Sequence, residues 1–191
     1  MRISAIMVIL NEEHYLENSI KSIMDFVEEI IIVNNNSTDD TKKILTKFSS
    51  NENCKIINFN KTQPILTAWK TAVNSASNEW ILRWDGDFIA NDFKELISYV
   101  TFKENFHDYF LLKAINLYGD IKHINSRTPV KSSGLWLARK KNLIITNDSR
   151  YALIFAPASG CRSTIVDKPE HIFHLSGVKP SDYLVYHSFR N

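Results

Sequence analysis

The sequence predicts an α/β protein whose first half forms a mostly parallel sheet with helices on both faces. In residues 3–103, short apolar runs alternate with segments whose apolar residues recur every three or four positions, as strands and helices do. Strands that alternate with helices of about 10–15 residues form βαβ units and therefore a parallel sheet. From Tyr109 onward, short strand-like runs predominate. The second half is therefore expected to hold a smaller mixed sheet.

The elements can be assigned in chain order. The apolar run at residues 3–10 predicts a strand that is buried on both faces. Further strands of the first half are expected at 30–33, 56–59 and 80–84, and helices at 16–27, about 38–48, 64–77 and 92–102. Ser37 or Thr38 is a candidate N-cap, and Pro64 suits the start of a helix. Strand-like runs of the second half lie at 109–118, 121–124, 134–138, 151–155 and 172–175.

Size and composition narrow the class of protein. A chain of 191 residues suits one domain over residues 1–191, either alone or as part of a longer protein. A formal net charge of +2 gives no reason to expect a nucleic-acid partner. Cys54 and Cys161 have no metal-binding spacing, which favours free thiols in a reducing compartment. The chain carries no signal peptide and no apolar run long enough to span a bilayer, so a cytoplasmic protein is expected. Such a protein could still act on an acceptor at a membrane surface.

Three polar clusters follow predicted strands directly. They lie at residues 11–13, 34–40 and 85–87. Ligands of parallel sheets bind outside the carboxyl ends of the strands, so the clusters are expected to meet in one crevice. Asn11 and Glu13 of the first cluster are candidate substrate-binding residues.

The cluster at residues 85–87 has the chemistry of a cation site. Asp85 and Asp87 lie on either side of Gly86, where the backbone can bend or let a phosphate approach closely. Carboxylate oxygens suit Mg²⁺ or Mn²⁺, with substrate phosphates completing the shell. An ordinary surface turn is the alternative for this short motif alone. Its position after a buried strand favours the metal.

These motifs together resemble glycosyltransferase family 2. The resemblance is carried by VILNEE at 8–13, EIIIVNNNSTDDT at 29–41 and ASNEWILRWDGD at 76–87, in the family's order and spacing. It covers roughly the first 100 residues well and the rest poorly. The resemblance implies a Rossmann-like GT-A fold, a nucleotide-diphosphate sugar donor, a divalent metal, and inversion at the anomeric carbon. It implies a nucleotide-sugar-binding half at 1–103 and an acceptor-side half at 104–191, with a carbohydrate or lipid-linked acceptor.

The resemblance also assigns roles to single residues. The family's Asp-x-Asp falls on Asp85 and Asp87, which would bind the metal and the donor's diphosphate. The family's base-recognising acidic residue falls on Asn34, whose carbonyl can still accept from a pyrimidine N3–H, so UDP is the expected nucleotide. The family's glycine in that turn falls on Asn36, a residue type that tolerates left-handed geometry. The family's Arg-Asn pair falls on positions 69 and 70, so Lys70 is expected to face a phosphate.

The end of the chain offers a third metal ligand. GT-A enzymes often place a late histidine on the metal, and His174 lies in an apolar strand-like run before Gly177. His171 would point to the other face of that strand. Lys179, just beyond, is a candidate partner for diphosphate charge. For both His174 and Lys179, a purely structural or surface role is the alternative.

The catalytic base has no clear motif. Inverting transfer needs a carboxylate beside the acceptor hydroxyl. Asp148 is the first candidate and Asp167 the second, with a solvated loop residue as the alternative for each. A non-catalytic sugar-nucleotide-binding module therefore stays open. A nucleotidyltransferase is the other rival, although the chain has residues 11–13 in place of a Gly-rich basic loop after the first strand.

Overall fold

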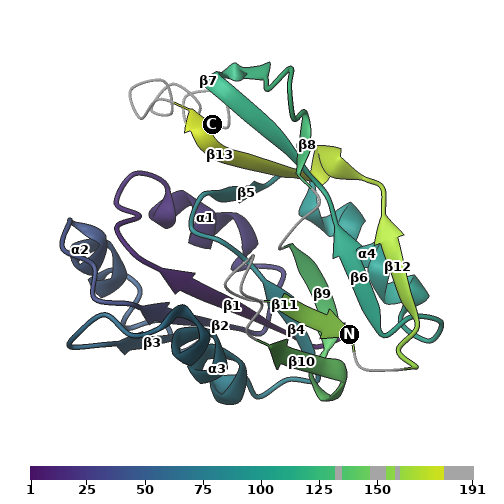
Figure 1. The fold of residues 1–191 in the computed structure, drawn as a ribbon, viewed down its shortest axis with the longest axis horizontal. Helices are drawn as coiled ribbons and strands as arrows, with labels where there is room; N and C mark the ends of the chain where they lie inside the picture. The colour runs from purple at the N-terminus through teal and green to yellow at the C-terminus, as the bar shows by residue number, and fades with distance from the viewer. Residues whose placement is uncertain (132–134, 147–153, 158–159, 179–191) are drawn as a thin grey trace.

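The computed structural model describes residues 1–131, 135–146, 154–157 and 160–178. These residues form three sheets: a seven-stranded one with helices around it, a four-stranded one above it in Figure 1, and a two-stranded one. None of the helices in these ranges has the length and apolar character needed to cross a bilayer.

The larger sheet has seven strands in the order β12-β6-β9-β4-β1-β2-β3. Its parallel part is formed by β1 (Ile3–Ile9), β2 (Glu29–Asn34), β3 (Cys54–Asn58) and β4 (Trp80–Arg83), which confirms the four predicted strands. The antiparallel β9 (Trp136–Arg139) joins β4 to β6 (Tyr109–Leu112), and β12 (Ser163–Val166) forms the edge. The sheet therefore takes strands from both halves of the chain.

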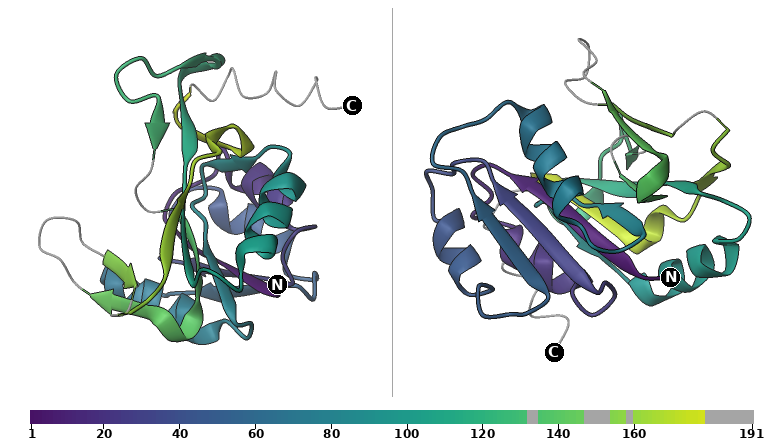
Figure 2. Two further views of the ribbon diagram at one scale, coloured as in Figure 1. Left: turned by 90° about the vertical axis from the view of Figure 1, so that its right-hand side faces the viewer. Right: turned by 90° about the horizontal axis from the view of Figure 1, so that it is seen from below.

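Helices cover both faces of this sheet, as predicted (Figure 2). Along β1, side chains alternate between the two faces, so that Met7 and Ile9 pack on one side and Ile6 on the other. The first face carries α1 (Leu16–Ile23), α2 (Thr41–Thr46) and α4 (Phe93–Lys103). The opposite face carries α3 (Ile65–Ser75). Burial of these apolar faces is the main favourable term for the fold.

The smaller sheet has the order β5-β13-β7-β8. It consists of β5 (Phe88–Ala90), β13 (Ile172–Val178), β7 (Ala114–Ile124) and β8 (Val130–Lys131). The late strand β13 runs antiparallel to β5, which directly follows Asp87, and parallel to β7. A separate hairpin pairs β10 (Leu143–Thr146) with β11 (Ile154–Pro157), and two 3-10 turns, η1 (Lys140–Asn142) and η2 (Pro169–His171), precede β10 and β13.

Several sequence-based boundaries were wrong. The predicted strand at 109–118 is two strands in different sheets, because the chain leaves the larger sheet at Lys113. Neither Ser37 nor Thr38 caps α2, which begins at Thr41 after Asp40. Strands β5, β8, β10 and β12 were not predicted. They are two to four residues long.

Candidate active site

Hydrogen bonds in both directions join the loop after β1 to the turn after β2. Three N–H groups of the first loop donate to side chains of the turn region: Asn11 to Ser37 Oγ (3.0 Å), Glu12 to Thr41 Oγ1 (2.9 Å) and Glu13 to Asp39 Oδ2 (3.1 Å). Two N–H groups of the turn donate back: Thr38 to Asn11 Oδ1 (2.8 Å) and Asp40 to Glu13 Oε2 (2.9 Å). The expected meeting of these two polar clusters is confirmed.

These contacts give Asn11 and Glu13 a structural task. Their side chains hold the turn after β2. The backbone is left-handed at Asn36 (φ 67°), which confirms the geometry expected where the family has glycine, and it is also left-handed at Asn11 (φ 58°). Contact of Asn11, Glu13 or Asn36 with a substrate stays a prediction.

Asn34 lies at the end of β2 with a relative exposure of 0%. Its Nδ2 donates to Asn58 Oδ1 (3.0 Å), and its Oδ1 accepts the N–H of Ser37 (2.9 Å). The two ends of the Asn34 amide therefore connect the turn after β2 with the end of β3. Recognition of a base by Asn34 stays a prediction, and it requires a ligand that reaches the second lone pair of Oδ1.

The strand-end motif of β4 lies beside α1. The carbonyl of Asp85 accepts from Ser19 Oγ (3.1 Å), which in turn accepts from the indole N–H of Trp84 (2.9 Å). The Asp85 carboxylate faces Arg83, with Nε 3.4 Å from Oδ1. The guanidinium of Arg83 lies over the ring of Trp69, 4.6 Å from its centre. Trp69, which stands at the family's arginine position on α3, thus packs against the guanidinium of Arg83, a residue of β4.

Glu12 is the acidic residue of this site that the sequence-based site assignment left out. Burial, followed by the charges of Asp87, Asp85 and Asp39, raises the pKa of Glu12 to about 7. The carboxylates of Asp87, Asp85 and Asp39 therefore lie near enough to Glu12 for their charges to act on it, and this repulsion favours a cation among them. The sequence shows two adjacent glutamates, and only the fold distinguishes them. The Glu13 carboxylate accepts the N–H of Asp40, whereas the Glu12 carboxyl lies near Asp85 and Asp87.

His174 lies against Asp87, as the prediction of a late histidine requires. On β13 it pairs with Phe88 of β5, and its Nε2 lies 3.1 Å from Asp87 Oδ2. The N–H of Leu175 donates to the Asp87 carbonyl (2.9 Å), which fixes the two strands beside each other. His171 belongs to η2 rather than to the strand, and its Nδ1 lies 3.3 Å from the carbonyl of Asn91. His174 is therefore the histidine that faces the aspartates.

The donor set at this place fits a divalent cation in part. Adjacent ligands of an octahedral ion with bonds of about 2.1 Å lie about 3 Å apart, and Asp87 Oδ2 and His174 Nε2 have that spacing. Within the described ranges, however, no three acidic, histidine or cysteine side chains form a ready-made metal-binding group. Asp87 and His174 can supply two ligands, with oxygens of a diphosphate or water needed for the rest.

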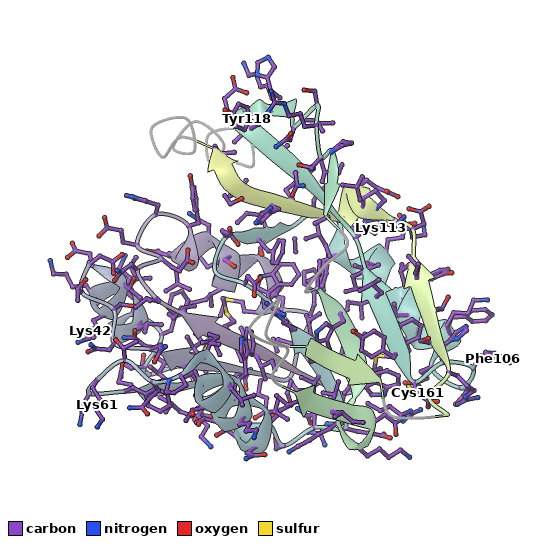
Figure 3. All side chains as sticks on the ribbon, viewed as in Figure 1. Lys42, Lys61, Phe106, Lys113, Tyr118 and Cys161 are labelled. Atoms are coloured by element: carbon purple, nitrogen blue, oxygen red, sulfur yellow. The ribbon has the colours of Figure 1, made fainter. Side chains whose placement is uncertain are left out.

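The other predicted site residues lie elsewhere. Lys70 is exposed on α3, and contact with a phosphate stays a prediction. Asp167 is 75% exposed and pairs with Lys113, labelled in Figure 3 (2.8 Å). It follows β12, three strands from β4 and so about 14 Å to the side. A role for Asp167 as a base stays a prediction. Asp148 and Lys179 lie outside the described residues.

Solved structures share this fold. Residues 1-349 of S. aureus TarS align over 96% of this chain and 62% of theirs, with a TM-score of 0.66 and 18% identity. The same protein in complex with UDP-GlcNAc aligns over 94% of this chain and 59% of its own, with a TM-score of 0.68 and 19% identity. The fold is therefore the GT-A fold.

Curated relatives cover parts of the sequence. A poly-beta-1,6-N-acetyl-D-glucosamine synthase of Staphylococcus epidermidis is 26% identical over 106 residues, which are 54% of this chain and 26% of the relative. An uncharacterized glycosyltransferase of Rickettsia felis is 28% identical over 136 residues, 67% of this chain and 43% of the relative. The chain thus spans less than half the length of these relatives. The family profile described as "Glycosyl transferase family 2" matches residues 4–159, and the chain belongs to that family.

Proposed function

We propose that this chain is a glycosyltransferase domain that moves a sugar from a UDP-sugar to a carbohydrate or lipid-linked acceptor, with a divalent metal and inversion at the anomeric carbon. The observation that carries the proposal is the meeting of Asp87 and His174 at 3.1 Å beside Asp85 and Glu12. Family membership and the fold support it. UDP-N-acetylglucosamine is the donor to test first, because the names of two similar proteins contain this sugar.

Each group at the crevice has a task in this proposal. Asp87 and His174 would hold Mn²⁺ or Mg²⁺, which would supply positive charge for the diphosphate leaving group. Asp85, two residues before Asp87 in the sequence, contacts the same phosphates or their water shell. Arg83 holds the Asp85 carboxylate from the α3 side of the sheet. Residues 1–103 bind the donor in this scheme, and 104–191 form the acceptor side.

The base that activates the acceptor is proposed to be Asp148. Asp167, which pairs with Lys113 at the end of the edge strand β12, is the alternative base. An Asp148→Asn variant should bind UDP-sugar normally but transfer at least about 100-fold more slowly, the usual range for loss of a general base. Unchanged transfer by this variant would remove Asp148 from the mechanism.

Binding and hydrolysis of UDP-N-acetylglucosamine test the function directly. Titration calorimetry with UDP should show binding that requires Mn²⁺. With UDP-N-acetylglucosamine and metal but no acceptor, slow hydrolysis that releases the sugar should be detectable. Asp87→Asn should abolish the metal-dependent part, whereas the matched variant Asp167→Asn should retain it, because Asp167 is exposed and remote. Metal-dependent binding without hydrolysis or transfer to any acceptor would favour a non-catalytic binding module. Equal binding by Asp87→Asn would contradict the metal site.

A further inference from the structure

We propose that Asn116 is a positioning residue, which holds His174 in the tautomer with hydrogen on Nδ1 and so directs the lone pair of Nε2 at Asp87. The consequence for metal binding rests on the function proposed above, whereas the tautomer itself does not. The inference starts from the contacts of one amide on β7.

Asn116 is fixed on two sides. Its Nδ2 lies 2.6 Å from the carbonyl of Thr128, and its Oδ1 lies 2.7 Å from Nδ1 of His174. Its backbone is fixed as well, since its N–H donates to Pro129 (2.9 Å) and its carbonyl accepts from Asn125 (2.8 Å). In the parallel pairing of β7 with β13, Asn116 is the register partner of His174. The amide therefore has little freedom to turn.

The Thr128 contact decides which end of the amide faces the histidine. A carbonyl oxygen can only accept, so the atom 2.6 Å from it must carry hydrogen and must be Nδ2. Turning the amide over would place two oxygens at that distance. Oδ1 therefore faces His174, and because Oδ1 is only an acceptor, this 2.7 Å contact is a hydrogen bond only when Nδ1 carries a hydrogen. The hydroxyl of Ser176, 3.4 Å from Nδ1, is too distant to compete strongly.

A neutral His174 fixed in this way has no hydrogen on Nε2. That nitrogen lies 3.1 Å from Asp87 Oδ2, so two electron-pair donors face each other across a distance that needs a positive charge between them. A divalent cation bound by both atoms would supply that charge. Hydrogen bonds from the far nitrogen of a ligating histidine fix its tautomer and orientation in metal sites generally.

The position of Asn116 also connects the metal site with the projecting β7–β8 hairpin. Thr128 and Asn125 belong to the turn of this hairpin, whose strand β7 carries the exposed Tyr118 labelled in Figure 3. The turn therefore supplies the contact that fixes the amide of Asn116. The orientation of His174 thus depends on the hairpin as well as on its own strand.

Nitrogen-15 NMR of the metal-free protein tests the tautomer. Long-range correlation spectra of His174 at about pH 8.5, where an ordinary imidazole is neutral, should show Nδ1 protonated and Nε2 bare. Asn116→Leu removes the acceptor at nearly constant volume and should shift His174 toward the Nε2–H form. Asn116→Asp loses the donor to the Thr128 carbonyl but keeps an acceptor beside Nδ1, so it should retain the wild-type tautomer. Asn116→Thr, which suits a strand and is too short to reach Nδ1, serves if the leucine variant does not fold. An unchanged His174 tautomer in the variants that lack the acceptor would overturn the inference.

Mn²⁺ affinity in the presence of UDP, measured by electron paramagnetic resonance, tests the consequence. Asn116→Leu should lower the affinity by about 10- to 100-fold, the range for outer-shell partners of metal ligands, and Asn116→Asp should restore most of it. Ser176→Ala is the control and should change neither tautomer nor affinity. If the wild-type protein binds no Mn²⁺ at all, the proposed function fails, while the NMR result still decides the role of Asn116.

Discussion

Glu12 packs against Gly86 so closely that a Cβ added at the glycine would lie 3.0 Å from the Glu12 Cγ. A side chain at position 86 would therefore need Glu12, from the loop after β1, to move by a few tenths of an ångström. The sequence suggested instead that Gly86 serves a backbone bend or a phosphate, and the structure adds this packing reason. The same contact brings the Glu12 carboxyl to the two aspartates.

A Gly86→Ala substitution should destabilise the protein by about 1–3 kcal/mol, the usual cost of overpacking. Most of this cost should disappear in a Glu12→Ala background, because the atoms that the new methyl group meets belong to Glu12. Chemical unfolding of the wild type, both single variants and the double variant gives the coupling energy. Additive effects would show that the contact does not decide the choice of glycine.

The raised pKa of Glu12 predicts how stability depends on pH. Burial is the first cause, followed by Asp87, Asp85 and Asp39, and the pKa rises from 4.5 to about 7. Between these two values the folded protein holds a proton that the unfolded chain has lost, so this group lowers stability as pH rises through the window. Glu12→Gln removes the effect, and its stability relative to wild type should increase by about 1–2 kcal/mol from pH 4.5 to 7.5, allowing for solvent screening.

Thermal unfolding of both proteins across this range checks the sign. Addition of Mn²⁺ with UDP at pH 7.5 should reduce the difference, because a nearby cation favours the ionised carboxyl. A constant difference across the pH range would mean that Glu12 titrates in the folded protein as it does in the unfolded chain.

The parallel half of the fold could be predicted because its strands are buried on both faces and read as apolar runs. The crevice followed from the same pattern, since carboxyl ends of parallel strands share one edge. Single contacts within it could not be predicted. Glu12 contacts Gly86 whereas Glu13 accepts the N–H of Asp40, and the two adjacent glutamates are not distinguished by the sequence. No sequence motif points to Asn116. It lies 58 positions from His174 in the sequence and contacts it only because β7 and β13 pair.

Asn34→Ala should affect both stability and nucleotide binding. It leaves the N–H of Ser37 and the side chain of Asn58 without their partner, which costs about 1–3 kcal/mol for a buried polar group. If the turn after β2 also recognises uracil, UDP affinity should fall by a similar free energy, provided that binding is measured below the melting temperature of the variant. Calorimetry with UDP and GDP tests the base preference. Binding of GDP to the wild type as tightly as UDP would contradict the assignment to a pyrimidine.

Glu29 should stabilise the start of β2 in a pH-dependent way. Burial raises its pKa, but hydrogen bonds from Ser4 Oγ, Ser77 and Asn78 outweigh it, and the net pKa is lowered. A lowered folded-state pKa gives stability that is present above pH 4.5 and lost as pH falls through the folded value. Glu29→Gln should therefore destabilise by about 1 kcal/mol at pH 7, and the difference should shrink by pH 3. Denaturant titrations at both pH values test this, and an equal loss at both would rule out the ionised form as the cause.

His174 and His171 offer a matched comparison for the metal site. His174 Nε2 faces Asp87, whereas His171 is buried in η2 with its Nδ1 near the carbonyl of Asn91. His174→Ala should lower Mn²⁺ affinity in the presence of UDP by at least about 10-fold and Mg²⁺ affinity less, because imidazole nitrogen suits the later ion better. His171→Ala should leave both affinities unchanged and instead lower the melting temperature through lost packing. Loss of Mn²⁺ binding only in His171→Ala would reverse the assignment, and no loss in either would leave the metal to Asp85, Asp87 and the diphosphate.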